Sequence, residues 1–292
     1  MIPVCDVQNS KGDSGFMLSR VGVRGVRKPV CILRDIDGNA LNSMLFCNID
    51  VFVDLPAIQK GSHLSRNLEA IKELIDDSAS TPITGIENLA TDLCKKLLEK
   101  HEYASTAEVN IQAEYFKNSV TPNGRTTMES YTLYGDAVGI RGQGIRKTIG
   151  VDVIGMTACP CAQQTVTEIL GCSDEWPVMS HNQRNVCSVF MNMDESENVE
   201  ANGLIDLIES SFSSPTFEVL KRDDEGAVVI NAHSNPKFVE DVVRTVLKKV
   251  VEKYDYLDDD VEIVIRSESE ESIHKHNAFA ERTATFGELR NE

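Results

Sequence analysis

Hydrophobic and polar residues follow regular periods along most of the chain, and these periods predict its secondary structure. Residues Met44–Leu55 alternate between apolar and polar as a half-buried strand does, and residues 18–33 also favour a strand. Apolar residues recur at helical spacing over 65–75 and again over 86–100. Two more strands are predicted, at residues 107–116 and 127–140. The first half is therefore predicted to run strand, strand, helix, helix, strand, strand.

The same order recurs in the second half, although the two halves share no visible sequence identity. Gly142, Gly144 and the basic pair Arg146–Lys147 mark the joint between them. Pro236 begins a long helical pattern, and proline is favoured at the first position of a helix. The elements predicted in this half are strands at 148–156, 185–193, 261–266 and 278–285 and helices at 204–211 and 236–254.

Pairs of strands followed by pairs of helices indicate an α+β fold with antiparallel sheets and the helices on one face. The repeat of pattern divides the chain into an N-terminal arm at residues 1–16, a first unit at 17–145 and a second unit at 146–292. The arm is polar and rich in Gly, Ser and Asp, which is typical of an irregular terminus. We predict two tandem units of the form ββααββ.

Composition narrows the class of protein. Hydrophobic residues make up 41% of the 292 residues and charged residues 26%, which allows a sizeable core. No apolar run reaches the roughly 18 residues that a membrane span needs, and the N-terminus lacks the features of a signal peptide. We therefore expect a cytoplasmic protein without a membrane partner. The net charge of −17 argues against nucleic-acid binding, and an anionic substrate would need a local cluster of cations and N–H groups.

One short segment at the end of a predicted strand carries unusual chemistry. Cys159 and Cys161 flank Pro160, whose fixed φ makes a tight turn that directs the two sulfur atoms differently. His181 begins the polar run His-Asn-Gln-Arg a short distance further on. Two buried thiols would be a purely structural explanation. Cys and His from neighbouring loops are also a common half of a catalytic zinc or iron site, and a nucleophilic cysteine is a further alternative.

Other histidines also lie in polar surroundings. His63 is flanked by Lys, Ser and Arg, and His274 and His276 lie among Ser, Lys and Asn. Alternate residues of a strand share a face, so the last two could point the same way. A lone histidine is usually a satisfied surface residue, but several histidines in polar loops favour a functional site.

Two glutamates are harder to separate from the many other acidic residues. Glu225 lies in a charged turn, for which a solvated loop is the simplest explanation. Glu240 lies on the long helix, where an ion pair with Arg244 four residues later would explain it. Periodicity alone gives neither residue a function.

Seven motifs run through nearly the whole chain: Val21–Pro29, Gln59–Arg66, Thr157–Ala162, His181–Arg184, Leu220–Glu225, Asn235–Asp241 and Glu271–His276. Each motif is modestly specific, and their shared order is the stronger signal. Together they resemble the GTP cyclohydrolases of type IB and their archaeal counterparts of type IV. The stretch between Cys161 and His181, which contains Cys172 and Trp176, is more similar to the archaeal branch.

This resemblance implies a tunnelling fold (T-fold), in which each chain has two ββααββ units and several chains close into barrels. It implies a homo-oligomer, a dimer or a tetramer, with active sites at the subunit interfaces. It also implies GTP as the substrate. One divalent metal ion would be bound per active site, with Fe(II) favoured and Zn(II) or Mn(II) as alternatives.

The resemblance also assigns roles to individual residues. These are Cys159, His181 and Glu225 as metal ligands, Cys159, His274 and His276 as catalytic groups, and Glu240 as the carboxylate that binds guanine. A carboxylate can accept hydrogen bonds from both N1–H and the 2-amino group of guanine, which selects guanine over adenine. Lys60, His63 and Arg66 lie in a Gly-containing loop at a helix N-terminus, which favours a triphosphate, and Arg184 is a further candidate.

The implied reaction is the hydrolytic opening of the imidazole ring of guanine. Its products would be 7,8-dihydroneopterin 2′,3′-cyclic phosphate and formate, for methanopterin biosynthesis. One alternative is the type IB product, 7,8-dihydroneopterin triphosphate. Another is a different tunnelling-fold enzyme that acts on a pterin or a deazapurine, with Cys159 as the nucleophile and no metal. A non-enzymatic acidic scaffold or binding protein is the remaining alternative.

Overall fold

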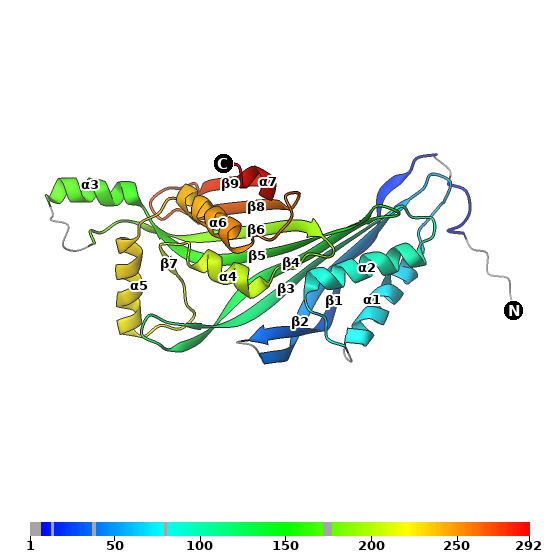
Figure 1. The fold of residues 1–292 in the computed structure, drawn as a ribbon, viewed down its shortest axis with the longest axis horizontal. Helices are drawn as coiled ribbons and strands as arrows, with labels where there is room; N and C mark the ends of the chain where they lie inside the picture. Colours follow the sequence, from blue (N-terminus) through cyan, green and yellow to red (C-terminus); the bar gives the residue numbers. More distant parts are fainter. Residues whose placement is uncertain (1–6, 13–14, 37–38, 79–80, 172–176) are drawn as a thin grey trace. The chain divides into compact units, whose positions relative to one another are not determined.

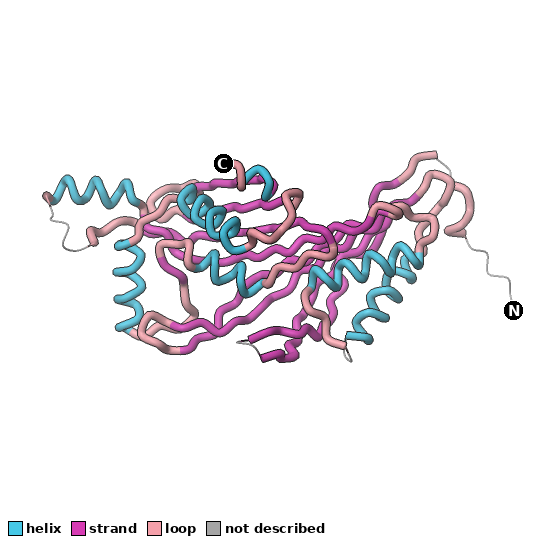
Figure 2. The backbone as a smooth tube through the Cα atoms, viewed as in Figure 1, coloured by secondary structure: helices cyan, strands magenta, loops and turns pink. Residues whose placement is uncertain are grey.

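The computed structural model describes residues 7–12, 15–36, 39–78, 81–171 and 177–292 (Figures 1 and 2). Cys172, Trp176 and part of the predicted arm lie outside the described residues. The chain falls into two compact units. Unit 1 comprises Met1–Glu114, Tyr134–Ile149 and Asn192–Asn198, and unit 2 comprises Tyr115–Leu133, Gly150–Met191 and Val199–Glu292.

The strands of the described residues pair in the order β1-β2-β3-β4-β5-β6-β8-β9, with β7 beside β5. The pairs β1–β2, β2–β3, β5–β7 and β8–β9 are antiparallel, which agrees with the predicted class of sheet. The strands are β1 (Leu18–Ile36), β2 (Asn39–Leu55), β3 (Thr106–Val120), β4 (Thr126–Ile140), β5 (Gly144–Ala158), β6 (Asn182–Asp194), β7 (Ser214–Pro215), β8 (Glu262–Glu270) and β9 (Ala278–Thr285). The helices are α1 (Leu64–Ser78), α2 (Ile86–Lys100), α3 (Pro160–Leu170), α4 (Ala201–Glu209), α5 (Arg222–Ser234), α6 (Val239–Lys253) and α7 (Phe286–Leu289).

Unit 1 has its two helices on one face of its strands. Helices α1 and α2 pack against each other, and α1 packs against β1 (Figure 1). The alternation of β2 places Leu45, Ile49 and Val53 in the core, while α2 buries Leu89 and Leu93 completely. Burial of side chains of this size stabilises the fold by about 1.5–3 kcal/mol each, so the apolar stripe of α2 fixes how the helix packs.

Unit 2 is organised around α6. This helix packs against β8, β9 and α4, and it buries Val242, Val246 and Val250 completely. Opposite it, β8 buries Ile263 and Ile265. Helix α3 differs, because none of its residues is buried, and Figure 1 shows it extending beyond the strands of this unit.

The second half contains more elements than its apolar pattern predicted. Helices α3 and α5 and the short strand β7 were not expected. Helix α3 has apolar residues at helical spacing, Ala162, Val166, Ile169 and Leu170, but buries none of them. Helix α5 buries few of its apolar residues, leaving Val229 and Ile230 exposed, and carries no helical apolar stripe. Without such a stripe, periodicity cannot find a helix.

The prediction that Pro236 begins a helix is wrong. Helix α6 begins at Val239, and the backbone N–H of Phe238 donates to the carboxylate of Asp241 at 3.0 Å. This contact fixes the start of the helix after the proline. Pro160 does occupy the first helical position, in α3, where a tight turn was expected. None of the helices in the described part of the chain is long and apolar enough to cross a membrane.

Asp54 fixes the start of β3 to the end of β2 in unit 1. Its carboxylate is 8% exposed and accepts hydrogen bonds from the backbone N–H of Ser105 and of Thr106, both at 2.8 Å. It also accepts one from the hydroxyl of Ser105 at 2.6 Å. We predict that Asp54→Ala lowers the free energy of unfolding by about 2–3 kcal/mol, because buried backbone donors lose their charged acceptor. Urea denaturation measures this.

Ser105→Ala is the matched control, because it removes only the hydroxyl contact and leaves both backbone N–H groups paired with Asp54. It should cost about 1 kcal/mol. Equal losses for the two variants would mean that the backbone contacts of Asp54 contribute nothing.

Candidate active site

A pocket of about 420 Å³ lies within unit 2 and gathers most of the predicted site residues. Its walls come from the end of β5, the starts of β6 and α6, the end of β8, the segment that follows β8, and the start of β9. The lining residues are Thr157, Cys159, His181, Gln183, Lys237, Phe238, Val239, Glu240, Ser269, Glu271, His274, His276, Ala278 and Phe279. The pocket therefore holds Cys159, His181, Glu240, His274 and His276, five of the residues proposed from the sequence.

Cys159 reaches the pocket because it caps a helix. It is the N-cap residue of α3, with its Sγ accepting from the backbone N–H of Ala162 at 3.4 Å. Its own backbone N–H donates to the carbonyl of His181 at 3.0 Å. The hydroxyl of Ser180 donates to the carbonyl of Cys159 at 2.6 Å. These contacts hold the start of α3 against the start of β6, so the thiol and the imidazole line one pocket.

Cys161 has a different environment. It lies in the first turn of α3, is exposed, and does not line the pocket. The remaining described cysteines include three that are buried, Cys47, Cys94 and Cys187. Burial raises the pKa of Cys47 and of Cys94 to about 12, so these thiols stay protonated and act as apolar core groups.

His181 is held by a buried amide. Gln183 Nε2 lies 3.0 Å from His181 Nδ1 and donates to Glu271 Oε2 at 3.2 Å. His181 and Glu271 are themselves close, with Nδ1 and Oε2 3.6 Å apart, and their side chains are only 12% and 10% exposed. Gln183 thus orients an imidazole and a carboxylate together. Neither Gln183 nor Glu271 was singled out from the sequence.

Gln183 is also part of a buried polar network that joins three strands. Thr157 Oγ1 on β5 donates to Gln183 Oε1 on β6 at 3.2 Å and lies 3.2 Å from Ser269 Oγ on β8. Asn185 Nδ2 donates to Ser269 Oγ at 2.9 Å, and Ser267 Oγ donates to Asn185 Oδ1 at 2.9 Å. Polar residues at inward positions of these strands were a signal available in the sequence, since Gln183 and Asn185 alternate with exposed Arg184.

The two late histidines lie side by side, as the alternation argument suggested, although they are not on a strand. They belong to the segment between β8 and β9, where their rings stack with centroids 5.2 Å apart and planes 13° apart. His274 also lies edge-on to His181, with centroids 6.2 Å apart. Both side chains are exposed, so they can exchange protons with water. The three imidazoles therefore form a row along one wall of the pocket.

Glu240 and Lys237 come from the opposite wall. Glu240 lies in the first turn of α6 and is exposed in the pocket, while Arg244 pairs with Asp241 at 3.7 Å. The expected helix-face pair between Glu240 and Arg244 is therefore replaced by one with Asp241. Burial, followed by the nearby charge of Lys249, lowers the pKa of Lys237, whose Nζ donates to the carbonyl of Ser211 at 2.8 Å.

Glu225 does not line this pocket. It is an exposed residue in the first turn of α5, whose opposite end approaches the pocket segment through His233 Nε2, 3.1 Å from the carbonyl of Ser180. The buried carboxylate of Asp224 beside it pairs with Arg125 and accepts from the N–H of Asn123 at 3.0 Å. The glutamate thus lies at the far end of a helix that is anchored at both ends.

The other predicted site residues also lie elsewhere. Arg184 is exposed on β6, on the face opposite Gln183, and does not line the pocket. Lys60, His63 and Arg66 belong to unit 1, where they occupy the loop before α1 and its first turn. The pocket is lined by unit 2 alone.

The donor types in the pocket suit a divalent metal ion, because a thiol, imidazoles and carboxylates are all ligands of zinc or iron. Within the described part of the chain, however, no three His, Cys, Asp or Glu side chains converge closely enough to hold a metal ion. Cys159 and His181 line the pocket and Glu225 does not. The pocket thus contains two of the three residues that were predicted to be metal ligands.

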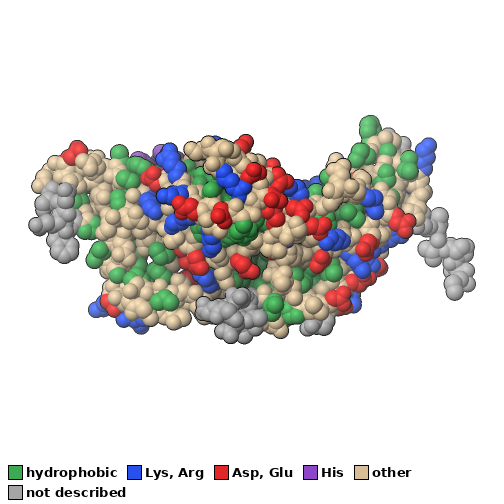
Figure 3. Space-filling view, viewed as in Figure 1, with side chains coloured by type: hydrophobic (Ala, Val, Ile, Leu, Met, Phe, Trp, Pro, Cys, Tyr) green, Lys and Arg blue, Asp and Glu red, His purple; other side chains and the backbone are tan. Residues whose placement is uncertain are grey.

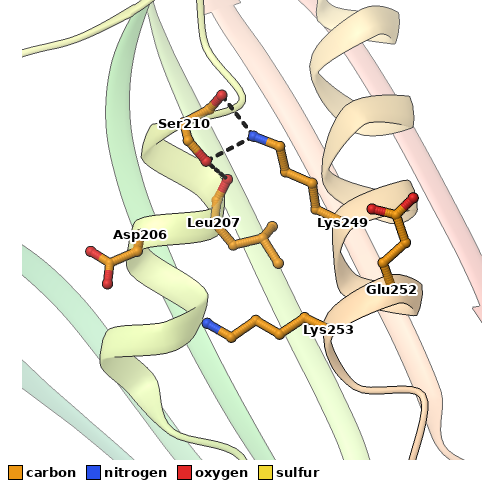
Figure 4. Close-up of a pocket in the computed structure, with 6 residues that line it drawn as sticks. All are labelled: Asp206, Leu207, Ser210, Lys249, Glu252 and Lys253. Atoms are coloured by element: carbon orange, nitrogen blue, oxygen red, sulfur yellow. Dashed lines mark hydrogen bonds between the residues drawn. The ribbon is translucent and has the colours of Figure 1, made fainter.

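A second pocket in unit 2, of about 400 Å³, lies between α4 and α6 (Figure 4). It contains none of the predicted site residues. Its lysines are committed to the protein, since Lys249 Nζ donates to the carbonyl of Ser210 at 2.8 Å and Lys253 Nζ donates to that of Gly203 at 3.0 Å. Figure 3 shows acidic and basic side chains interspersed on the visible face, without a broad basic surface there. The pocket that contains Cys159 is the better candidate.

Comparison with solved structures places the fold in a known class. A hyper-thermostable AgUricase mutant superposes with a TM-score of 0.52 at 10% identity, covering 91% of each chain. A uricase from Bacillus fastidious gives 0.51 at 11% identity, covering 94% of this chain and 95% of that one. These likenesses establish a uricase-like α+β fold and carry no information on chemistry.

Comparison with protein sequences is more specific. The family model described as "Type I GTP cyclohydrolase folE2" matches residues 4–280. The GTP cyclohydrolase MptA 1 of Methanocella arvoryzae is 47% identical, with 98% of this chain and 95% of that protein covered. The GTP cyclohydrolases MptA of Methanosphaera stadtmanae and Methanococcus aeolicus are 42% and 39% identical, over 98% and 99% of this chain. The chain belongs to the type I GTP cyclohydrolase family, which confirms the resemblance seen in its motifs.

We predict that Gln183→Leu lowers GTP turnover by about 10- to 100-fold, the usual effect of losing the partner that orients an active-site imidazole. The reason is that Leu cannot donate to His181 or Glu271. Steady-state kinetics measures the effect, and circular dichroism checks the fold. The control is Gln164→Leu on exposed α3, which should have no effect. Wild-type turnover by Gln183→Leu would show that His181 needs no such support.

Proposed function

We propose that the protein is a GTP cyclohydrolase that opens the imidazole ring of guanine by hydrolysis and releases formate. The observation that carries this proposal is the family match over residues 4–280, together with one pocket that contains Cys159, His181, Glu240 and the paired histidines. Water must attack C8 of guanine, and protons must reach the ring nitrogens as bonds break. Each of these tasks has a suitable group in the pocket.

Guanine recognition is proposed for Glu240. Its carboxylate is exposed in the pocket, and Arg244 pairs with Asp241 instead. The carboxylate can accept from both N1–H and the 2-amino group, an edge that adenine does not offer. Phe238 and Phe279 also line the pocket and supply apolar surface for a flat base.

Proton transfer is proposed for His274 or His276. Their rings are stacked, and His274 approaches His181. A guanine bound in this pocket could therefore receive a proton that the exposed pair takes up from water. Imidazole is suited to this task because its ordinary pKa lies near neutrality. Gln183 and Glu271 hold His181 in a fixed orientation beside them.

We further propose that the site binds one divalent metal ion, with Fe(II) favoured over Zn(II) and Mn(II). Cys159 and His181 would hold it, with Glu225 as the third ligand that the family resemblance assigns. When bound, the ion supplies Lewis acidity that lowers the pKa of water toward ~7. Because Glu225 does not line the pocket of its own chain, its participation requires a rearrangement or a second subunit.

In a homo-oligomer with shared active sites, Glu225 could come from a second subunit. Within the described residues, β2 is the only strand that pairs with β1, whose other edge is covered at Ile32 by a bridge to Ile83, and β9 pairs with β8 alone, so each leaves much of a strand edge. Such edges are usually covered by a partner. In unit 1, Met44 and Phe46 are 56% and 77% exposed on β2, which favours burial against another surface. We propose a dimer or tetramer of tunnelling-fold subunits, each with two ββααββ units at 17–145 and 146–292.

The proposed product is 7,8-dihydroneopterin 2′,3′-cyclic phosphate, released with formate and diphosphate, as the resemblance to the archaeal type IV branch implies; the relatives named GTP cyclohydrolase MptA support that branch. The triphosphate form is the second candidate. A tunnelling-fold enzyme with Cys159 as nucleophile is the third, and it is favoured by the place of this half-buried thiol in the pocket and at a helix N-terminus.

Removal of metal tests the hydrolytic proposal. Exhaustive treatment with a chelator should abolish GTP turnover, and Fe(II), Mn(II) or Zn(II) should restore part of it, because uncoordinated water is too weak a nucleophile at neutral pH. Turnover is followed by the ultraviolet change as guanine opens. ATP should remain unchanged throughout. Full activity in protein shown to be metal-free would contradict the proposal and favour a nucleophilic cysteine.

The two neighbouring cysteines offer a matched pair of variants. Cys159→Ala should purify with much less metal and lose ring opening, since a thiolate ligand is removed. Cys161→Ala should retain both, because Cys161 is exposed on α3 and outside the pocket. Metal analysis and turnover distinguish them. Bound metal in an inactive Cys159→Ala variant would identify this residue as an acid or a nucleophile.

Glu240→Gln tests guanine recognition. An amide presents one donor and one acceptor to an edge that offers two donors, so one contact becomes a repulsion. Loss of a charged bidentate contact in a desolvated site should reduce transition-state stabilisation by about 2–5 kcal/mol. Glu252→Gln on the same helix, outside this pocket, is the control. Unchanged kcat and KM for Glu240→Gln would reduce Glu240 to a surface residue.

A further inference from the structure

Residues 59–66 of unit 1, the loop before α1 together with the first residues of that helix, contain the cations proposed to bind phosphate. The N-terminal segment of the chain holds the backbone of this loop by hydrogen bonds. The backbone N–H of Lys60 donates to the carbonyl of Ser10 at 2.9 Å, and that of Gly61 donates to the carbonyl of Gln8 at 3.2 Å. Gln59 Nε2 donates to the carbonyl of Gly61 at 3.0 Å. The backbone of the loop is therefore hydrogen-bonded to Gln8 and Ser10, near the N-terminus.

The other side of the loop is held by the end of α2. Ser62 Oγ lies 2.8 Å from Tyr103 Oη, which lies 2.9 Å from His101 Nδ1. His101 Nε2 lies 2.6 Å from Asn67 Oδ1, in the first turn of α1. Arg66 Nη1 donates to the carbonyl of Lys100 at 2.9 Å. One short segment, residues 100–103, thus contacts both the loop and the helix that follows it.

The hydrogen bonds of this network can be assigned donors and acceptors in one consistent order. Asn67 Oδ1 can only accept, so the proton of His101 lies on Nε2, and Nδ1 accepts from the hydroxyl of Tyr103. Tyr103 then accepts from the hydroxyl of Ser62. Burial, followed by the charges of Arg66, His63 and Lys100, lowers the pKa of His101 to about 4, so its ring is neutral at physiological pH.

The network is also buried, except at Tyr103, which is half-buried. His101 and Asn67 are 0% exposed and Ser62 is 7% exposed, so water cannot replace a lost partner easily. The hydroxyl of Tyr103 connects Ser62 directly to His101. Apart from Asn67 Nδ2, which is buried without a hydrogen-bond partner among the described residues, the polar side-chain atoms of the network are paired, and paired groups in such surroundings fix one geometry rather than many.

We infer that the network of Ser62, Tyr103, His101 and Asn67 is a positioning device for the phosphate-binding loop. It sets Lys60, His63 and Arg66 for the polyphosphate of the nucleotide before the substrate arrives. The inference rests on the proposed function. Its physical basis is that a preorganised loop binds an anion without the entropic cost of ordering its cationic side chains.

The variant that tests the inference is Tyr103→Phe, which removes one hydroxyl and keeps the ring. It should raise KM for GTP about 5- to 10-fold, the loss expected for one or two hydrogen bonds, while kcat falls less than 2-fold. The dissociation constant of inorganic triphosphate should rise by the same factor, and that of guanosine should stay unchanged. A defect confined to the polyphosphate is something that a general loss of stability does not produce.

Ser62→Ala breaks the same contact from the side of the loop and serves if Tyr103→Phe folds poorly. The double variant should bind triphosphate no worse than Tyr103→Phe alone, because that change already removes the contact with Ser62. The control is Ser78→Ala, at the other end of α1, where a buried hydroxyl donates to the carbonyl of Ile75 at 2.7 Å. It should leave KM unchanged.

The outcomes separate the inference from the function on which it rests. Wild-type turnover of GTP with unchanged KM in both Tyr103→Phe and Ser62→Ala would overturn the inference alone. Equal weakening of triphosphate and guanosine would also overturn it, because the network would then support the whole protein. A wild-type protein that neither binds nor converts GTP would overturn the proposed function and the inference together.

Discussion

The hydrogen bond from the backbone N–H of Cys159 to the carbonyl of His181, at 3.0 Å, determines the candidate site. It joins the start of α3 to the start of β6, two points separated along the sequence by a whole helix. The thiol and the imidazole line the same pocket because the backbone brings them there. The buried polar network of Thr157, Gln183 and Ser269 then restricts how the imidazole can turn. The chemistry proposed for the pocket depends on that restriction.

Charge imposes a second constraint. A chain with a net charge of −17 repels an anionic nucleotide at long range, so attraction must come from local groups. The proposed recognition separates the tasks: a carboxylate for the two donors of guanine, and the loop with Lys60 and Arg66 for the phosphates. A carboxylate and a polyphosphate repel each other, which is a physical reason to bind them with different groups.

The sequence predicted the first half of the fold well, because both helices of unit 1 have one apolar face and its strands alternate. It failed at α5, which exposes Val229 and Ile230 and has no helical period. Helix α3 is short and buries none of its residues, although Ala162, Val166, Ile169 and Leu170 recur at helical spacing. The Cys-Pro-Cys segment predicted a tight turn there, so the placement of Cys159 at a helix N-cap was not predicted.

The site was predicted in part. The motifs identified five lining residues. Gln183 and Glu271 lie within two of these motifs, but their roles come from contacts across strands, which a motif does not show. Motif matching also could not reveal that Glu225 lies outside the pocket, because order in the sequence does not encode distance. That separation is the physical reason for proposing a shared, interfacial site.

The central claim is that this pocket opens the guanine ring. The most direct measurement is anaerobic incubation of the purified protein with GTP and Fe(II), with formate quantified and the pterin identified by mass spectrometry. The account predicts formate equimolar with the GTP consumed, a dihydroneopterin phosphate as the other product, and no reaction with ATP. Unchanged GTP, or GTP consumed without formate, would contradict it.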